Sequence, residues 1–402
     1  MIHPLRYLLP FVLLSWECRA QELSCRRPAS IPARGYSVSL YSDSLLLMAG
    51  QSRAKLKDVN VLPIHLLDAT ISLKHIARAG KDTTWVFDHG HQDGLRSAIR
   101  TMNGNIVAVG HQQADGKNEH RRAWAIRLDR HGNRQWSITL GGGIPGTALD
   151  LLELPNGHLL VIGRYRTDEH GYDIMLHRLD SHGKVLWEKL LHPLLGSMFK
   201  DMKCMDNGDI ILLTGHRHAG SKNRYSALTR IDPNGEVQWK RDLKYDGHTL
   251  LGRLHVFSDD RLVLAGTTVT DSKEHETSRS LLVLELSGRG EPRVEYHPAR
   301  GKVNVSGLFR SGSGRIGILM VEQGHTDGGR AYSLLSLGGD ERHDGPLRVL
   351  SDAMEMAVYD CVAYGSSGGR LALAGLFIKE GHEYTAALLD TGTGEVSILN
   401  GR

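Results

Sequence analysis

Two short stretches of this chain hold residue types that could do chemistry. Asp88-His-Gly-His-Gln-Asp93 places two histidines and an aspartate close together, and such side chains bind zinc when a third or fourth ligand converges on them. No converging ligand can be identified. Gly365-Ser-Ser-Gly-Gly369 matches the pattern G-x-S-x-G, but a nucleophilic serine in that pattern stands between a strand and a helix. We expect strands on both sides here, so we interpret the match as a hairpin turn and predict neither catalytic residues nor a bound metal.

A larger polar set is spread over successive segments of the chain. Histidine is frequent, with 22 residues, and histidines and arginines recur after short apolar runs and in the connections between segments. Because each recurs at a similar place in its segment, we expect them to share one face. The residues of this candidate binding face are His89, His91, Asp93, His111, Arg164, His192, His216, Arg217, His218 and His248. The face either binds a partner or is a solvated loop surface. If its histidines are exposed, it gains positive charge near pH 6–6.5.

The segments that position these residues repeat with a fixed period. Four tryptophans, at 85, 136, 187 and 239, are spaced 51, 51 and 52 residues apart. A short apolar run recurs seven times, and its ends are spaced 60, 53, 52, 51, 54 and 55 residues apart. A turn pair precedes most run ends by six residues, but Asn207-Gly208 in the fourth copy precedes its run end by seven. A period in this range indicates a repeat architecture.

One repeat, residues 147–197, predicts four short strands. Apolar alternations at 147–154, 158–166, 173–179 and 184–191 are separated by Asn156-Gly157, a polar stretch, and a turn from Asp180 to Gly183. Asn-Gly between alternating strands is a strong hairpin signal. A sheet of this size buries its faces only against neighbours, and a ring of sheets provides them. We predict an all-β, seven-bladed β-propeller with four antiparallel strands per blade and the first strand innermost. A helix is most expected at 55–76.

Recurring tryptophans and aspartates are assigned structural roles. Trp85, Trp136, Trp187 and Trp239 are predicted to fill the gaps between blades. Asp129, Asp180 and Asp232 open equivalent turns, where an aspartate can accept hydrogen bonds from the backbone ahead of it. Asp150 and Asp201 recur on the innermost strand. They either line the mouth of the channel or bond the backbone of the neighbouring blade.

The repeat motif resembles known families. The pattern Arg-Leu-Asp-x-x-Gly-x-x-x-Trp at 178–187, with Asn-Gly-x-Leu-Leu-Val-x-Gly at 156–163, resembles exported bacterial propeller-repeat proteins of Bacteroidetes-type genomes. The stretches at 178–187 and 388–396 are also similar to the tryptophan-docking repeat of pyrroloquinoline quinone (PQQ) enzymes and their non-enzymatic relatives. The resemblance implies a propeller and export. Those quinone enzymes usually have eight blades and a vicinal cysteine pair, which this chain lacks, so we expect no cofactor.

The N-terminus predicts export. Arg6, an apolar core at 7–16 and Cys18-Arg-Ala20 are typical of a signal peptide cleaved after Ala20, which leaves one domain at 21–402. The core is shorter than the roughly 20 residues that span a bilayer. Lipidation at Cys18 is the alternative, although Trp16 and Glu17 fit a lipidation box poorly. The mature chain should be periplasmic, surface-located or secreted, and monomeric.

Composition excludes some partners. A formal charge of +4 is small for this length and gives no argument for nucleic acid, which calls for a clustered basic face. Three cysteines in the mature chain are too few, and odd in number, for a disulfide framework. Two hypotheses from different classes remain. The chain is a non-catalytic binding or scaffold propeller for a protein or glycan, or it is a quinone- or metal-dependent enzyme acting at the channel mouth.

Overall fold

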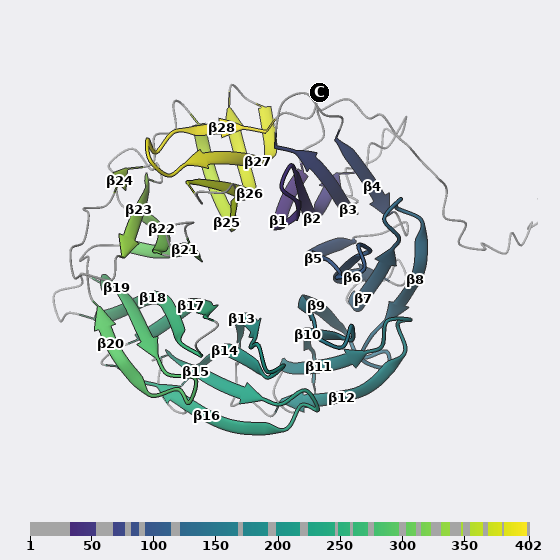
Figure 1. Ribbon diagram of the computed structural model, residues 1–402, viewed down its shortest axis with the longest axis horizontal. Coiled ribbons are helices and arrows are strands. Elements are labelled where there is room, and N and C mark those ends of the chain that lie inside the picture. Colours follow the sequence, from purple (N-terminus) through teal and green to yellow (C-terminus); the bar gives the residue numbers. More distant parts are fainter. Residues whose placement is uncertain are drawn as a thin grey trace, which may run out of the picture.

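The fold is taken from a computed structural model of the chain. It describes residues 33–53, 67–76, 82–87, 93–113, 121–167, 172–191, 198–217, 224–245, 248–257, 260–271, 277–296, 303–310, 315–322, 331–337, 347–348, 354–364, 369–379 and 382–399. The predicted fold is confirmed. Seven four-stranded antiparallel sheets are arranged in a ring, and their innermost strands surround a central axis that we call the channel (Figure 1). No helix occurs among the residues just given.

Each blade consists of four strands that follow one another in the sequence. The innermost strands are β1 (Ala33–Ser42), β5 (Gly94–Arg100), β9 (Gly146–Glu153), β13 (Met198–Cys204), β17 (His248–Val256), β21 (Val303–Arg310) and β25 (Met354–Tyr364). The second strands are β2 (Leu45–Arg53), β6 (Ile106–Gln113), β10 (Leu159–Tyr165), β14 (Ile210–Arg217), β18 (Leu262–Asp271), β22 (Ile316–Glu322) and β26 (Arg370–Lys379). The third strands are β3 (Leu67–His75), β7 (Arg121–Leu128), β11 (Asp173–Leu179), β15 (Arg224–Ile231), β19 (Thr277–Leu286), β23 (Ala331–Leu337) and β27 (His382–Asp390). The outermost strands are β4 (Thr83–Phe87), β8 (Arg134–Thr139), β12 (Val185–Leu191), β16 (Val237–Leu243), β20 (Pro292–Tyr296), β24 (Leu347–Arg348) and β28 (Val396–Ile398).

The recurring apolar runs are the second strands of the blades. In β6, both the odd and the even positions from Ile106 to His111 are buried, because each face of the sheet packs against a neighbouring blade. A strand that is buried on both faces has a continuous apolar sequence instead of an alternating one. The outermost strand β8 is exposed or half-buried along its length. Side-chain burial thus decreases from the second strand to the fourth, which explains why the second strand gave the clearest repeat signal.

The ring closes without exchange of strands. The first blade contains only strands β1–β4 and the last only β25–β28. Side-chain packing joins them, since Val38 and Met48 share an apolar cluster with Ala372 and Ala386. One polar contact reinforces the junction: Val38 N donates to Asp360 Oδ2 at 3.0 Å. The first and last blades are therefore held together by packing and hydrogen bonds between sheets.

The repeated tryptophans lie between blades, but they are half-buried and not fully buried as predicted. Each ring covers a turn glycine of the next blade. A Cβ built on Gly183 would lie 2.9 Å from the Trp136 ring, and the Gly183 φ of +85° also favours glycine. Trp136 Nε1 donates to Ser181 O at 3.2 Å. Among the described tryptophans, the one that is fully buried is Trp124 on β7.

The insertion in blade 1 differs from the prediction where it is described. The stretch at 55–76 was the place where a helix was most expected, but its second part is β3, the third strand of blade 1. Leu67–His75 pairs along its whole length with β2, and backbone pairing of this kind outweighs local helix preference. Residues 54–66 and the proposed signal peptide lie outside the described residues. No helix in the described part is long and apolar enough to span a membrane.

Candidate binding face at the channel mouth

The two faces of the ring differ in their connections. The tight hairpins between first and second strands, and between third and fourth strands, lie on one face, which we call the turn face. The connections from second to third strands and from blade to blade lie on the other, the loop face. Longer connections are where propellers and other repeat proteins tend to vary and bind. The candidate residues of the sequence were all expected on the loop face.

The described candidates lie at or near the loop face, but with different exposure. Arg164 and Arg217 are exposed. His248 accepts a hydrogen bond at Nδ1 from Arg224 N at 3.0 Å. Asp93 is buried, and its Oδ1 accepts a hydrogen bond from Gln113 N at 3.1 Å. The candidates His89, His91, His192 and His218 lie outside the described residues.

His111 and His216 are not exposed loop residues, contrary to the prediction. They belong to β6 and β14, and are 2% and 4% exposed. Burial lowers the pKa of His111 to about 3, with Arg121 and Arg96 adding to the effect. Burial also lowers the pKa of His216 to about 4, with Lys240 next in effect. The expectation that these two histidines charge near pH 6–6.5 is therefore wrong.

A group of arginines gathers where blades 2 and 3 meet the channel mouth. We call Arg96, Arg121 and Arg164 the arginine cluster. Burial lowers the pKa of Arg96; Tyr36 opposes the effect and the cations Arg121 and Arg164 add to it. The Arg96 guanidinium lies 4.2 Å from the centre of the Tyr36 ring, a cation–π contact. The Tyr36 ring in turn lies 5.8 Å from that of Tyr359. Sequence reasoning identified only Arg164 of this cluster.

A pocket opens on the loop face between blades 4 and 5. It has a volume of about 300 Å³ and includes Lys200, Arg217 and Arg224 in its lining. Burial lowers the pKa of Lys200, and the cations Arg224 and Arg253 lower it further. Sequence reasoning found Arg217 but missed Lys200 and Arg224. They lie on strands β13 and β15, and the sequence search considered the loops.

Every innermost strand carries a β-bulge at the same place. The bulged residues, skipped in the pairing with the second strand, are Tyr36, Arg96, Leu149, Lys200, Gly252, Ser306 and Tyr359. A bulge re-aims the side chains next to it. Arg96 of the arginine cluster and Lys200 of the pocket thus occupy equivalent positions in different blades. The bulge therefore places these two cations at the same height in their blades.

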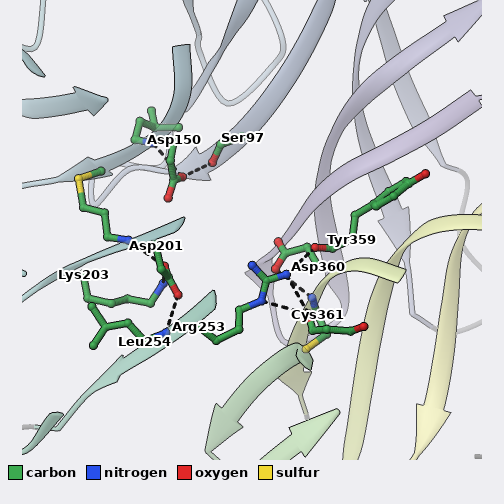
Figure 2. Close-up of polar contacts among 12 residues, drawn as sticks. Ser97, Asp150, Asp201, Lys203, Arg253, Leu254, Tyr359, Asp360 and Cys361 are labelled. Atoms are coloured by element: carbon green, nitrogen blue, oxygen red, sulfur yellow. Dashed lines mark hydrogen bonds and ion pairs between the residues drawn. The ribbon is translucent and has the colours of Figure 1, made fainter. Parts of the chain in front are cut away.

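The residues after the bulges join neighbouring blades along the channel wall. Asp201 Oδ2 accepts from Leu254 N of the next blade at 2.8 Å. Ser97 Oγ donates to Asp150 Oδ1 at 2.7 Å. Asp201 thus bonds the neighbouring backbone, and Asp150 bonds a neighbouring side chain (Figure 2). Burial raises the pKa of Asp150 to about 6, although Lys203 and the Ser97 hydrogen bond oppose the effect.

Arg253 links three blades on one side of the channel. Its Nη2 donates to Ser306 O and to Tyr359 O, both at 2.8 Å, and Figure 2 shows the side chain reaching the inner strand of blade 7. Lys203 Nζ pairs with Asp201 Oδ1 at 2.8 Å while its side chain is 43% exposed. Burial opposes the charge of Lys203, but Asp201, Asp150 and Asp360 raise its pKa. The polar groups of the wall are largely engaged with one another.

The remaining sequence candidates have local partners or lie outside the description. Asp129, Asp180 and Asp232 each accept two backbone hydrogen bonds through Oδ1 within their own turns. No three histidine, cysteine, aspartate or glutamate side chains of the described residues are close enough together to hold a metal. Of the G-x-S-x-G stretch, only Gly369 is described.

Comparisons with known proteins identify the fold. No protein-family model matches the chain, and no curated protein matches its sequence. A mutant of puromycin hydrolase complexed with PGG is similar, with TM-score 0.60 and 13% identity, over 92% of this chain and 54% of that chain. Pyrococcus horikoshii acylaminoacyl peptidase has TM-score 0.53 and 12% identity, over 92% and 52%. The β-propeller domain of the Trilobed protease from Pyrococcus furiosus, described as having an open velcro topology, has TM-score 0.51 and 12% identity, over 92% and 98%. The chain spans about half the length of the hydrolase and the peptidase. The similarity at this identity is one of fold.

Proposed function

We propose that the chain is an exported, non-catalytic binding propeller whose loop face recognises an acidic partner, a protein or a glycan. The observation that carries the proposal is the crowding of cations at the mouth of the channel. Burial and neighbouring cations both act against the charge of Arg96 and of Lys200. An anionic partner would relieve this repulsion, because an opposite charge within a few ångströms favours the charged form.

The acidic side chains described near these cations are engaged elsewhere, which supports the proposal. Asp173 accepts a hydrogen bond from Thr167 Oγ1 at 2.6 Å. Glu188 pairs with His177 Nδ1 at 2.8 Å, and Asp242 with Lys244 Nζ at 2.8 Å. Arg164, Arg217 and Arg224 are exposed, so an anionic ligand can reach them from solution. Such charges mainly set association rate and specificity.

A paired comparison of faces tests the proposal. Arg121→Ala with Arg164→Ala removes two exposed cations from the loop face, and Arg130→Ala with Arg134→Ala removes two from the turn face of blade 2. The probes are poly-L-glutamate for acidic proteins and heparin for anionic glycans. An exposed charge contact contributes about 0.2–1 kcal/mol, so the loop-face pair should weaken binding roughly twofold to thirtyfold.

The turn-face pair is the matched control and should bind like the native protein. Binding should weaken as salt is added, because exposed charges are screened beyond about 10 Å at 0.1 M. Equal losses in the two pairs would indicate general charge attraction and contradict the proposal. So would unchanged binding by the loop-face pair. The response to each of the two probes tells protein and glycan partners apart.

The runner-up function is an enzyme that uses the channel mouth. The observation in its favour is the group of ionisable side chains on the channel wall, where Asp150 has a pKa of about 6. Such a value suits a proton-transfer group near neutral pH. Similarity in fold to a hydrolase and a peptidase is compatible with this alternative. A metal analysis and hydrolysis of an aminoacyl p-nitroanilide, with Asp150→Asn as the variant, test it. The absence of bound metal together with the absence of hydrolysis above background would rule out this alternative.

A further inference from the structure

One blade lacks a side chain at a position that the other blades fill. The position follows the second-strand residue that pairs with the innermost strand just before its bulge, a residue that is glycine in five of the seven blades, and it faces the start of the innermost strand. Its occupants, in blade order, are Gln51, His111, Arg164, Gly215, Thr267, Val321 and Leu376. Blade 4 alone has glycine here, because its apolar run is one residue longer and the glycine is shifted by one position toward the loop face. Thr214 occupies the place where most other blades have glycine.

The missing side chain leaves room for a lysine and for the pocket beside it. A Cβ built on Gly215 would lie 3.1 Å from Lys200 Cε, so the aliphatic stem of Lys200 lies over the glycine. In blades 2 and 5, the glycines Gly110 and Gly266, which hold the position equivalent to Thr214, instead lie against the backbone of the innermost strand. The one-residue shift in blade 4 thus creates the pocket, of about 300 Å³. This volume is at the lower end of the range for small-ligand sites.

The polar part of the pocket is cationic. Lys200, Arg217 and Arg224 are in its lining, together with His216, which burial keeps neutral above about pH 4. Among the described residues, none of these three cations is within ion-pair distance of a carboxylate. Arginine and lysine together suit an oxyanion, because their N–H groups form charge-assisted hydrogen bonds.

The rest of the lining is apolar or already bonded. Met198 and Leu250 form apolar walls. The buried Ser226 is engaged on both sides, donating to Thr249 O at 3.1 Å and accepting from Leu251 N at 2.9 Å. A sugar acid, which carries hydroxyl groups around its ring, would leave them unpaired against these walls, at a cost. An anion that is apolar beside its charge fits better.

From this geometry we infer that the Lys200 pocket binds a carboxylate carried next to an apolar side chain, as in the C-terminal residue of a polypeptide or a free acid of that shape. The inference rests on the proposed function, since it names the group of an acidic partner that the loop face would hold. The carboxylate would lie between Lys200, Arg217 and Arg224, and the apolar side chain against Met198 and Leu250.

Ligand-observed NMR titration at about pH 7.5 with small probes tests this inference. N-acetyl-leucine is the probe, N-acetyl-leucinamide lacks its carboxylate, and acetate lacks its apolar part. A hydrogen bond to a charged group contributes enough that its loss weakens binding roughly tenfold to hundredfold. The amide and acetate should therefore bind at least about tenfold more weakly. A peptide ending in leucine, free or amidated at its C-terminus, then shows whether a polypeptide end is accepted as well as a free acid.

Two variants locate the binding, and one controls for charge. Lys200→Met removes the ammonium, and Gly215→Thr fills the pocket with the residue that blade 5 has there. Each should weaken N-acetyl-leucine binding about tenfold or more. Lys244→Met removes an equal charge from the same blade outside the pocket lining and should have no effect. Thermal unfolding checks that each variant folds. If Gly215→Thr does not fold, the result with Lys200→Met alone tests the inference.

The outcomes separate this inference from the function on which it rests. Equal binding of N-acetyl-leucine and its amide, or native affinity in Lys200→Met, would overturn the inference. If the inference is overturned but poly-L-glutamate binding still depends on Arg121 and Arg164, the proposed function is supported without the pocket. If neither probe binds, both fail.

Discussion

Acidification should destabilise the protein through its two buried strand histidines. In the folded protein, burial lowers the pKa of His111 to about 3 and that of His216 to about 4. In the unfolded chain both have a pKa near 6.5, so the unfolded state binds more protons between these values. Stability from this source is complete above about pH 6.5 and is lost as the pH falls toward 4 and then 3. At pH 5, about 1.5 pH units below the unfolded value, each histidine costs about 2 kcal/mol.

The assay is urea unfolding of the native protein and of the double variant His111→Gln/His216→Gln, at about pH 7.5 and about pH 5. The free energy of unfolding of the native protein should fall by about 4 kcal/mol more than that of the variant. Contributions from His177 and His255, whose pKa values burial also lowers, cancel in this comparison. The exposed His182 supplies a control, His182→Gln, that should keep the native pH dependence. A difference below about 1 kcal/mol between native and double variant would refute the assignment of neutral, buried histidines.

Three further stability predictions follow from the blade contacts, each measured by urea unfolding at neutral pH. Trp124→Ala should cost about 3–5 kcal/mol, as for fully buried aromatics, and Trp187→Ala less, about 1.5–3 kcal/mol, because its ring is half-buried; a reversed order would contradict the described burial. Arg253→Met should lower the free energy of unfolding by about 1–3 kcal/mol, because hydrogen bonds to two carbonyl groups are lost. An unchanged free energy of unfolding would show that this link does not stabilise the fold. Gly183→Ala should cost at least about 1 kcal/mol, because its φ is positive and the Trp136 ring covers it; a neutral effect would contradict that packing.

The blade count and strand order could be predicted because the repeat signals are local. Asn-Gly and Asp-x-x-Gly turns fix where strands end, and strands buried on both faces are apolar throughout. The continuous run from Ile106 and the turn at Asp180 are examples. These signals depend on residues close together in the sequence, so a single chain displays them. The start of the second strand of each blade was located to within one residue in this way, but the strands extend two to five residues beyond the ends of the predicted runs.

The candidate site was harder to predict because it depends on register and on contacts between blades. His111 and His216 follow apolar runs and were placed in loops, but β6 and β14 continue through them and turn both rings inward. Arg96 and Lys200 reach the channel mouth because they occupy bulges, which have no sequence signature here. Trp124 falls outside the tryptophan period and was therefore overlooked. The extra residue in the turn spacing of the fourth copy was the visible sign of the shift at Gly215.

The central claim, that the loop face binds an acidic partner, is tested most directly by hydrogen–deuterium exchange with and without poly-L-glutamate. Binding at the loop face should slow exchange in peptides that cover the end of β6, the start of β7 and the ends of β10 and β14. Exchange at the turn-face hairpins 129–133, 180–184 and 232–236 should not change. Protection that is confined to the turn face, or that is absent from both faces at saturating ligand, would contradict the account.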